Sequence, residues 1–343
     1  MNVLLCGDPQ QPSEYMYEAL GHLEDRGLTF ERMDWMGEAS PGEFRNVTMD
    51  MESLGPGSYD TDAIAERLDG IDALVVHKAP VSRELIESGD SLSIVGAARG
   101  GTENVDIDAA HEHDITVLHA PGRNRDAVAD YAVSMLLSRV REIPFNHADL
   151  STGEWSQVFD PDQLPPDMRT ATVGIVGFGH IGRGVARRLA GFETECLVYD
   201  PFVADEEIRD AGSEPADLPD LLAEADAVTL HVRLSKDTAE MIGEEQFAQM
   251  NDEAYLVNTA RGGLVDEEAL VDALAADEIG GAALDVFQDE PLPDDHPLLD
   301  FENVVLTPHV AGSTRDAVLG GPRIIATQLE AHLDDETPEH VVQ

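Results

Sequence analysis

Positive charge and cysteine are scarce in this sequence. Of its 343 residues, 21 are Lys or Arg and 69 are Asp or Glu, so the formal net charge is −48. So anionic a chain is repelled by nucleic acid and by anionic membrane surfaces, and we expect neither as a partner. The two cysteines, Cys6 and Cys196, lie in apolar runs and cannot build a disulfide framework. A reducing, cytoplasmic location is therefore expected.

Long apolar stretches are also missing. No run approaches the roughly 18 apolar residues of a membrane-spanning helix. The first residues, MNVLLCGD, have no basic region and too short an apolar run for a signal peptide. We expect neither membrane insertion nor secretion.

Lysine is almost absent, because only Lys78 and Lys236 occur and the other cations are arginines. The acidic residues are spread over most predicted helices, which is typical of a solvated surface rather than an interaction tail. This composition resembles that of cytosolic proteins from organisms that hold molar salt in the cell. At about 1 M salt the Debye length is roughly 3 Å, which suppresses the self-repulsion of such a chain. The sequence therefore predicts a halophilic protein.

A chain of this length usually forms two domains. Short aliphatic runs alternate with helix-period segments, which predicts an α/β fold with parallel sheets. The first series of expected strands covers residues 3–6, 73–77, 93–97 and 115–118, with helices near 14–24, 63–68, 82–88 and 107–111. Residues 28–59 show no pattern to which we assign a structure.

A second series of strands follows a break at residues 120–123. Asn124 can cap a connecting helix, and a polar segment, residues 151–170, leads into the series. The expected strands cover residues 172–176, 196–199, 227–230, 254–258, 281–284 and 304–306. Six strands suffice for a complete doubly wound domain. The last helix is expected to open with a capping box at Ser313 and Asp316, and we expect no strand after it.

A glycine-rich turn follows the first strand of this second series. The sequence TVGIVGFGHIG places Gly177, Gly179 and Gly182 in a G-x-G-x-x-G pattern between a strand and a helix. In a dinucleotide site the three glycines allow a tight turn, close approach of a pyrophosphate and close helix packing. The phosphates would lie at the helix N-terminus, beside His180 and Ile181. The alternative is an ordinary strand-to-helix turn without a ligand.

Asp200 ends the next strand, where a carboxylate can accept hydrogen bonds from an adenosine ribose. The same carboxylate would repel a 2′-phosphate, and the following Pro201 and Phe202 supply no cation for one. The pattern favours NAD over NADP. An Asp-Pro turn at a strand end would have the same sequence.

Three later strands are followed by polar residues that suit acid-base chemistry. Arg261, Glu290 and His309 come after separate strands, and the carboxyl ends of parallel strands share one edge of a sheet. Arginine binds a carboxylate through two nitrogens, histidine exchanges a proton near neutral pH, and a carboxylate favours the charged imidazole. Together the three predict hydride chemistry on a hydroxy acid. Singly, each could instead cap a helix or form an ion pair.

The run His111-Glu112-His113-Asp114 contains four groups that can bind metals. Adjacent residues at the end of a helix point in different directions, so we do not predict a metal site here.

These residues resemble the D-isomer-specific 2-hydroxyacid dehydrogenases, a family that includes phosphoglycerate dehydrogenases and glyoxylate/hydroxypyruvate reductases. The resemblance covers most of the chain. It is carried by GAARGGTENVD at residues 96–106, the glycine turn, YDP at 199–201, NTARG at 258–262, LDVF at 284–287 with EP at 290–291, and TPH at 307–309.

The resemblance implies roles for individual residues. His309 would be the acid/base, Glu290 its partner and Arg261 the substrate clamp. The resemblance further places Thr259, Asp285 and His231 near the cofactor. The backbone of Gly100 and Gly101, with Arg99 beside them, would contact the substrate. Arg99 would meet an extra anionic group on the substrate, or it simply lies on the surface. The chain departs from the family at residues 231–234, where HVRL replaces the usual His-x-Pro-Leu.

The resemblance also implies an architecture and an activity. Residues 1–120, completed by 313–343, would form a flavodoxin-like substrate domain, and residues 121–312 an inserted doubly wound NAD-binding domain. Members are usually homodimers built through the cofactor domain. The predicted function is an NAD-dependent D-2-hydroxyacid dehydrogenase acting on a small 2-oxo or 2-hydroxy acid, with the two domains closing over the site. The alternatives are an NADPH-preferring 2-ketoacid reductase and a dinucleotide-sensing protein without catalysis.

Overall fold

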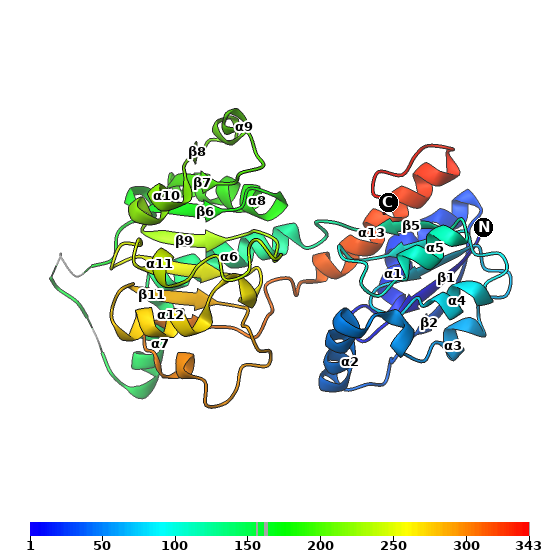
Figure 1. Cartoon of the computed structure of the whole chain (residues 1–343), viewed down its shortest axis with the longest axis horizontal. Coiled ribbons are helices and arrows are strands. Elements are labelled where there is room, and N and C mark those ends of the chain that lie inside the picture. The colour runs from blue at the N-terminus through cyan, green and yellow to red at the C-terminus, as the bar shows by residue number, and fades with distance from the viewer. Residues whose placement is uncertain (156, 161–163, 343) are drawn as a thin grey trace. The chain divides into compact units, whose positions relative to one another are not determined.

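The computed structural model describes residues 1–155, 157–160 and 164–342. The chain forms two compact units (Figure 1): unit 1 consists of residues 1–124 and 314–343, and unit 2 of residues 125–313. Each unit holds one parallel sheet, of five strands in unit 1 and seven in unit 2. The predicted α/β class, with one doubly wound domain inserted in the other, is confirmed.

The sheet of unit 1 has the strand order β2-β1-β3-β4-β5, which is the flavodoxin-like order. Its strands are β1 (Asn2–Gly7), β2 (Thr29–Asp34), β3 (Ala73–Val76), β4 (Ile94–Ala97) and β5 (Thr116–His119). The register places Val3 opposite Ala73 and, between the next two strands, Val75 opposite Gly96. β3 and β4 are buried along their whole length, as their unbroken aliphatic runs require.

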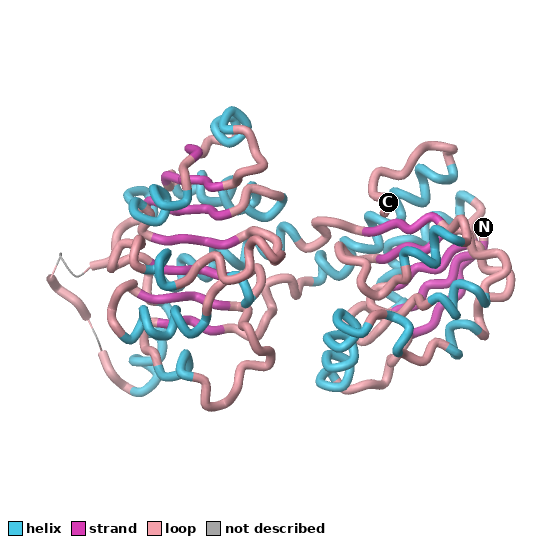
Figure 2. Tube along the Cα trace, viewed as in Figure 1, coloured by secondary structure: helices cyan, strands magenta, loops and turns pink. Residues whose placement is uncertain are grey.

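Helices cover both faces of this sheet (Figure 2). They are α1 (Ser13–Leu20), η1 (Gly21–Arg26), α2 (Pro41–Leu54), η2 (Pro56–Ser58), α3 (Asp62–Ala65), α4 (Arg83–Ser88), α5 (Ile107–Glu112) and α13 (Arg315–Leu333). One apolar cluster joins α1 and α13 to the sheet, with Met16, Leu20 and Ile325 fully buried. A second cluster lies on the other face, under α2, α4 and α5.

The segment at residues 28–59, to which the sequence pattern gave no structure, contains β2 and α2. β2 is an edge strand whose residues are mostly exposed, so it lacks the apolar signal of its neighbours. α2 does carry a start signal: Ser40 and Glu43 form a capping box ahead of the buried Phe44.

The predicted start of the last helix is wrong by one residue. Thr314, not Ser313, caps α13 by accepting a hydrogen bond from the Ala317 amide at 3.1 Å. After this helix, an antiparallel bridge joins Val341 to Leu118.

The sheet of unit 2 has the order β12-β11-β10-β9-β6-β7-β8. Counted along the chain this is the Rossmann order with one added strand, and the order reverses between β6 and β9. The strands are β6 (Thr172–Val176), β7 (Glu195–Tyr199), β8 (Glu214–Pro215), β9 (Ala227–Leu230), β10 (Tyr255–Asn258), β11 (Gly281–Leu284) and β12 (Val304–Leu306). All six predicted strands are present. β8 was not predicted because its two residues carry no apolar pattern.

The helices of unit 2 also lie on both faces of their sheet (Figure 1). They are α6 (Arg125–Val140), α7 (Ile143–Thr152), η4 (Met168–Thr170), α8 (His180–Leu189), η5 (Ala190–Phe192), α9 (Asp205–Asp210), α10 (Leu218–Glu224), α11 (Glu244–Phe247), η6 (Gly262–Leu264), α12 (Glu267–Ala275) and η7 (Pro297–Asp300). The polar segment expected at residues 151–170 falls partly outside the described residues, at 156 and 161–163. Within the described ranges, no helix combines the length and the apolar character needed to cross a bilayer.

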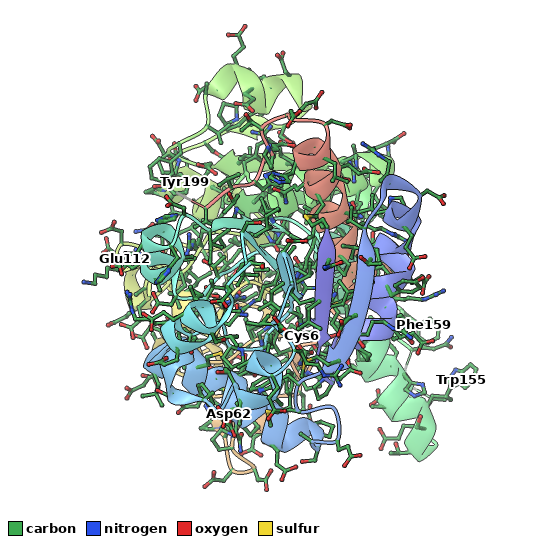
Figure 3. All side chains as sticks on the ribbon, turned by 90° about the vertical axis from the view of Figure 1, so that its right-hand side faces the viewer. Cys6, Asp62, Glu112, Trp155, Phe159 and Tyr199 are labelled. Atoms are coloured by element: carbon green, nitrogen blue, oxygen red, sulfur yellow. The ribbon has the colours of Figure 1, made fainter. Side chains whose placement is uncertain are left out.

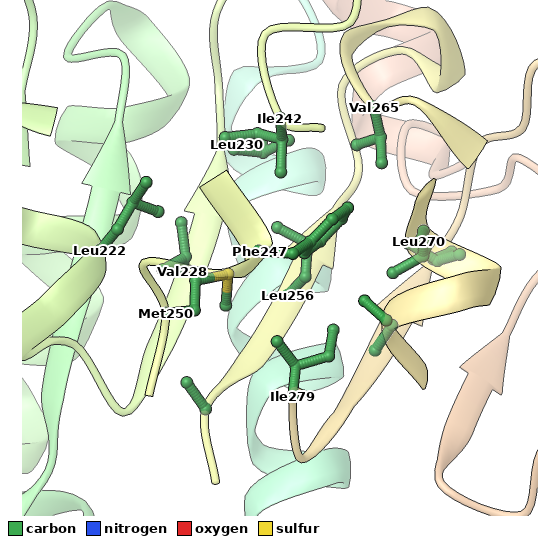
Figure 4. Close-up of a cluster of buried hydrophobic side chains, with 14 of the residues drawn as sticks. Leu222, Val228, Leu230, Ile242, Phe247, Met250, Leu256, Val265, Leu270 and Ile279 are labelled. Atoms are coloured by element: carbon green, nitrogen blue, oxygen red, sulfur yellow. The ribbon is translucent and has the colours of Figure 1, made fainter. Parts of the chain in front are cut away.

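Phe247 lies at the centre of the apolar layer beneath α10, α11 and α12 (Figure 4). Its ring is fully buried and lies among Val228, Leu256 and Met250. This layer fixes β9 and β10, whose carboxyl ends carry candidate site residues.

We expect Phe247→Ala to lower the free energy of unfolding by about 3–5 kcal/mol, because it leaves a cavity in a close-packed layer. The measurement is urea unfolding followed by circular dichroism in molar KCl. Phe202→Ala is the matched control, since Phe202 is 95% exposed, and it should change stability by less than about 0.5 kcal/mol. Equal effects of the two substitutions would contradict the central position of Phe247 in this layer.

Candidate active site

The glycine turn lies where the strand order of unit 2 reverses. Gly177 follows β6 in a left-handed conformation, with φ at +96°, and its amide donates to the Tyr199 carbonyl at 2.8 Å. The turn leads directly into α8, which begins at His180. In open α/β sheets, the carboxyl edge at such a reversal is the usual ligand site.

The three glycines meet different surroundings. A Cβ on Gly182 would lie 2.0 Å from the Gly177 carbonyl oxygen, so α8 can approach the strand only with glycine there. A Cβ on Gly179 would meet no atom within 4 Å, which leaves open space above the turn. His180 is exposed and Ile181 half-buried at the start of α8. This arrangement fits a pyrophosphate approaching Gly179 at the helix N-terminus.

Asp200 closes the turn from the neighbouring strand. Its carboxylate accepts the amide of Phe178 at 2.7 Å and the amide of Phe202 at 2.9 Å. The side chain is therefore held beside the glycine turn, and a carboxylate has lone pairs left for ribose hydroxyls.

Two buried polar atoms near the same edge have no hydrogen-bond partner among the described residues. They are Nδ1 of His231 and Oγ1 of Thr259. The other ring nitrogen of His231 lies 3.0 Å from the Thr229 hydroxyl, and burial lowers the pKa of His231 to about 3. His231 is thus a neutral imidazole with a free polar atom. Buried polar atoms without a hydrogen-bond partner fit a site where a ligand with polar groups supplies the missing hydrogen bonds.

Asp285 follows β11 and is fully buried. One carboxylate oxygen accepts the Thr307 hydroxyl at 2.7 Å and the Val310 amide at 2.9 Å, and the other accepts the Ala311 amide at 2.8 Å. The predicted role of Asp285 beside the cofactor stays a prediction. What the structure adds is that Asp285 anchors the loop after β12.

His309 lies in the middle of that anchored loop. It adopts a left-handed conformation, with φ at +52°, and its amide donates to the Asp285 carbonyl at 2.8 Å. Its Nδ1 lies 2.7 Å from Oε2 of Glu290. The imidazole is 47% exposed and the Glu290 side chain 22%, so the pair is open to a ligand.

Glu290 is held as a carboxylate. Partial burial raises its pKa, but the hydrogen bond and charge of His309, the Phe287 amide and the charge of Arg261 together lower it below the ordinary value. The Phe287 amide donates to Oε1 at 3.1 Å. Glu290 is therefore ionised at neutral pH.

Arg261 stands at the end of β10, with an exposed side chain whose charge acts on Glu290. The buried Asn258 fixes its backbone by donating to the Arg261 carbonyl at 2.9 Å and accepting the Ala260 amide at 3.0 Å. Gly262 packs against Phe287 so closely that a Cβ would lie 1.9 Å from its carbonyl. Arg261, Glu290 and His309, which follow β10, β11 and β12, are thus brought together.

The predicted substrate residues Arg99, Gly100 and Gly101 follow β4 in unit 1. Their loop is held by the end of β5: the Ala120 amide donates to the Arg99 carbonyl at 2.8 Å, and Nδ1 of His119 lies 2.9 Å from the Gly100 carbonyl. The Arg99 guanidinium pairs with Glu103 at 3.2 Å. All other candidate residues belong to unit 2.

A buried polar cluster in unit 1 was not predicted. Asp8, after β1, lies 2.9 Å from Nδ1 of His77 and accepts the Lys78 amide at 2.9 Å. Arg123 lies 3.4 Å from the other ring nitrogen of His77. Burial lowers the pKa of His77, although Asp8 opposes it. The signal was available, since Asp8 follows one predicted strand and His77 ends another.

Three residues of the run at 111–114 have separate partners. Glu112 pairs with Arg83, and His113 lies 3.9 Å from Glu87. His111 lies 3.4 Å from the Val342 carbonyl. In the part of the chain that the structure describes, no three His, Cys, Asp or Glu side chains gather as metal ligands.

Comparison with known proteins agrees with this geometry. Residues 133–311 match the family model "D-isomer specific 2-hydroxyacid dehydrogenase, NAD binding domain". The chain is 39% identical over 327 residues to a glyoxylate reductase of Korarchaeum cryptofilum, covering 93% of both proteins. The chain belongs to the D-isomer specific 2-hydroxyacid dehydrogenase family. Unit 2 is accordingly its NAD-binding domain.

Other members differ in length and substrate. The chain is 40% identical over 259 residues to a D-3-phosphoglycerate dehydrogenase of Archaeoglobus fulgidus, which is 75% of this chain and 49% of that protein. It thus spans about half the length of that relative. The fold is also similar to that in a crystal structure of D-lactate dehydrogenase with NAD+ from Lactobacillus jensenii. The superposition covers 100% of this chain and 100% of that one, with a TM-score of 0.79 and 26% sequence identity.

Two glycine substitutions separate folding from cofactor binding. Gly182→Ala should destabilise the protein by about 1–3 kcal/mol, because the new methyl group meets main chain that cannot rotate away. Gly179→Ala should leave stability unchanged and weaken NADH binding about tenfold or more, since its methyl group would occupy the approach of the pyrophosphate. Thermal unfolding and NADH fluorescence titration measure the two effects. Unchanged NADH affinity in Gly179→Ala would place the pyrophosphate elsewhere.

Proposed function

We propose that this protein is an NAD-dependent D-2-hydroxyacid dehydrogenase, working as a 2-oxo acid reductase in the reverse direction. The observation that carries the proposal is the 2.7 Å contact between His309 and Glu290 beside Arg261. Besides the hydride that the reduced cofactor supplies, reduction of a 2-oxo acid requires proton exchange, charge stabilisation and carboxylate binding. Family membership supports the same activity.

His309 is the proposed acid/base. With Nδ1 directed at Glu290, the proton to be transferred is the one on Nε2. In reduction, the charged imidazole donates this proton to the C2 oxygen. In oxidation, the neutral imidazole accepts it from the hydroxyl. Glu290 orients the ring and stabilises its charged form.

Arg261 is the proposed clamp for the substrate carboxylate and C2 oxygen, because its planar guanidinium can bind two oxygens at once. Arg99, Gly100 and Gly101 are proposed substrate contacts from unit 1. The cofactor would be held by Gly177, Gly179, His180, Ile181, Gly182, Asp200, His231, Thr259 and Asp285. When bound, its nicotinamide ring supplies or accepts the hydride.

The activity is tested by measuring oxidation of NADH and NADPH with a panel of 2-oxo acids. The panel contains glyoxylate, hydroxypyruvate, pyruvate and larger sugar-derived acids, and the buffer contains molar KCl because we propose a halophilic protein. Turnover with NADH supports the proposal, and faster turnover with NADPH would reverse the cofactor preference. NADH binding without turnover on any acid would favour a dinucleotide sensor.

His309→Ala should lower kcat about 100-fold or more while leaving NADH affinity within about twofold, since the residue acts in proton transfer. Steady-state kinetics and fluorescence titration measure the two quantities. His332→Ala, at an exposed position in the last turn of α13, is the control and should keep full activity. Near-native turnover in His309→Ala would overturn the mechanism.

We also propose a homodimer built through unit 2. Large apolar side chains are exposed on α7 and on the segment between α7 and β6, and such surfaces usually mark protein contacts. They are Ile143, Leu150, Trp155, Val158, Phe159 and Leu164. Trp155 is 75% exposed and Phe159 83% exposed, and Figure 3 labels both side chains. Association through this segment would remove them from water.

Replacing Trp155 and Phe159 together by Glu should convert the dimer to a monomer, because burying two carboxylates in an apolar interface is unfavourable. Size-exclusion chromatography with light scattering in molar KCl gives the mass. Phe202→Glu is the control, since Phe202 is also a strongly exposed aromatic residue, and it should leave the dimer intact. A wild-type monomer, or a double variant that remains dimeric, would contradict the proposal.

A further inference from the structure

A carboxylate from outside the loop that carries Glu290, that of Glu267, contacts two residues of this loop. This loop comprises residues 285–296, between β11 and η7. Glu267, the first residue of α12, contacts the loop near both of its ends. One oxygen of Glu267 accepts the Gln288 amide at 3.2 Å, and the other lies 3.1 Å from Nε2 of His296.

The hydrogen bond between Glu267 and His296 has a fixed direction. The Leu298 amide donates to Nδ1 of His296 at 3.3 Å, so this nitrogen carries the lone pair. The proton of the neutral ring is therefore on Nε2, which donates to Glu267. Both side chains are well covered, with 17% of His296 and 14% of Glu267 exposed. Partly buried hydrogen bonds to a charged acceptor are stronger than exposed ones.

A third contact ties the same segments. The side-chain amide of Gln288 donates to the Val265 carbonyl at 3.0 Å, two residues before Glu267. The neighbouring Phe287 amide is the one that donates to Glu290. Gln288 is thus bonded to Glu267 and Val265, and the adjacent Phe287 amide is bonded to Glu290. The same short stretch of backbone links α12 to Glu290.

We propose that Glu267 is a positioning residue. By binding the loop at Gln288 and His296, it keeps Glu290 within hydrogen-bonding distance of His309. The inference rests on the proposed function, because it assigns a task within that acid/base pair. Glu267 acts through the loop, since both of its carboxylate oxygens are engaged by Gln288 and His296. Reacting groups displaced by about 1 Å lose roughly 100-fold in rate, so a loosened loop has a measurable effect.

The main test compares Glu267→Ala and Glu267→Gln with Glu268→Gln. Glu268 is the next residue of α12, is exposed, and has the same charge near the helix N-terminus. We expect Glu267→Ala to lower kcat about 10- to 100-fold with NADH affinity within about twofold. Glu267→Gln keeps one acceptor oxygen and should lose less, and it also serves if the alanine variant does not fold. Glu268→Gln should match the wild type.

A comparison of kcat with KM separates positioning from a general loss of stability. Because Glu267 is proposed to act on the pair that transfers the proton, Glu267→Ala should lower kcat per NADH-binding site and leave KM for the 2-oxo acid within about twofold. A merely structural role would lower the number of NADH-binding sites and leave kcat per site unchanged.

A second variant tests whether His296 acts through its contact with Glu267. His296→Ala should lower kcat in the same direction, and the double variant with Glu267→Ala should be no worse than Glu267→Ala alone. Multiplied losses would show that the two residues act independently and would overturn the proposal.

Hydrogen exchange of the peptides covering residues 286–298 tests the inference without any assay of turnover. Faster exchange in Glu267→Ala than in Glu268→Gln supports the proposal that Glu267 holds this loop in place, and equal exchange overturns it. If the wild type reduces no 2-oxo acid, the proposed function fails and exchange alone decides this inference. If the wild type is active and Glu267→Ala matches it in kcat per NADH-binding site, the inference fails and the proposed function stands.

Discussion

The buried carboxylate of Asp285 is the interaction on which the candidate site depends. A fully buried charge is tolerated only where hydrogen bonds replace its hydration. Asp285 receives one hydroxyl and two amide hydrogens, all from the loop after β12. The loop is therefore folded around the carboxylate, and His309, in its left-handed conformation, is carried to a fixed place. Removing Asp285 would leave two amides and a hydroxyl without acceptors, at a cost of about 1–3 kcal/mol each.

The site is built from strand ends that have different surroundings. At the reversal of strand order, the glycine turn, Asp200 and the orphaned atoms of His231 and Thr259 form the part suited to a dinucleotide. At β10, β11 and β12, buried side chains fix the backbone while Arg261 and His309 stay accessible. Buried polar groups thus supply rigidity, and exposed ones are left for chemistry.

The net charge of −48 repels every anionic ligand at long range. The proposed substrates and cofactor are anions, so their approach in dilute buffer would be opposed. At about 1 M salt the Debye length of roughly 3 Å limits electrostatics to direct neighbours. Under that condition the surface acids have little influence on binding, and the proposed local contacts, Arg261 and the N-terminal end of α8, would determine it.

The sequence by itself determined the strands that are buried on both faces, because such strands are continuous aliphatic runs. It also determined the glycine turn and the three polar residues after β10, β11 and β12, since the carboxyl ends of parallel strands share one edge. It did not reveal β2, whose exposed edge residues lack a pattern, or β8, which has two residues. Only the tertiary structure decided that Asp285 anchors the His309 loop, that Glu267 meets Gln288 and His296, and that Asp8 meets His77. Each of these contacts joins residues about 20 or more positions apart. Sequence spacing does not specify such contacts, because they depend on the order in which the strands pack.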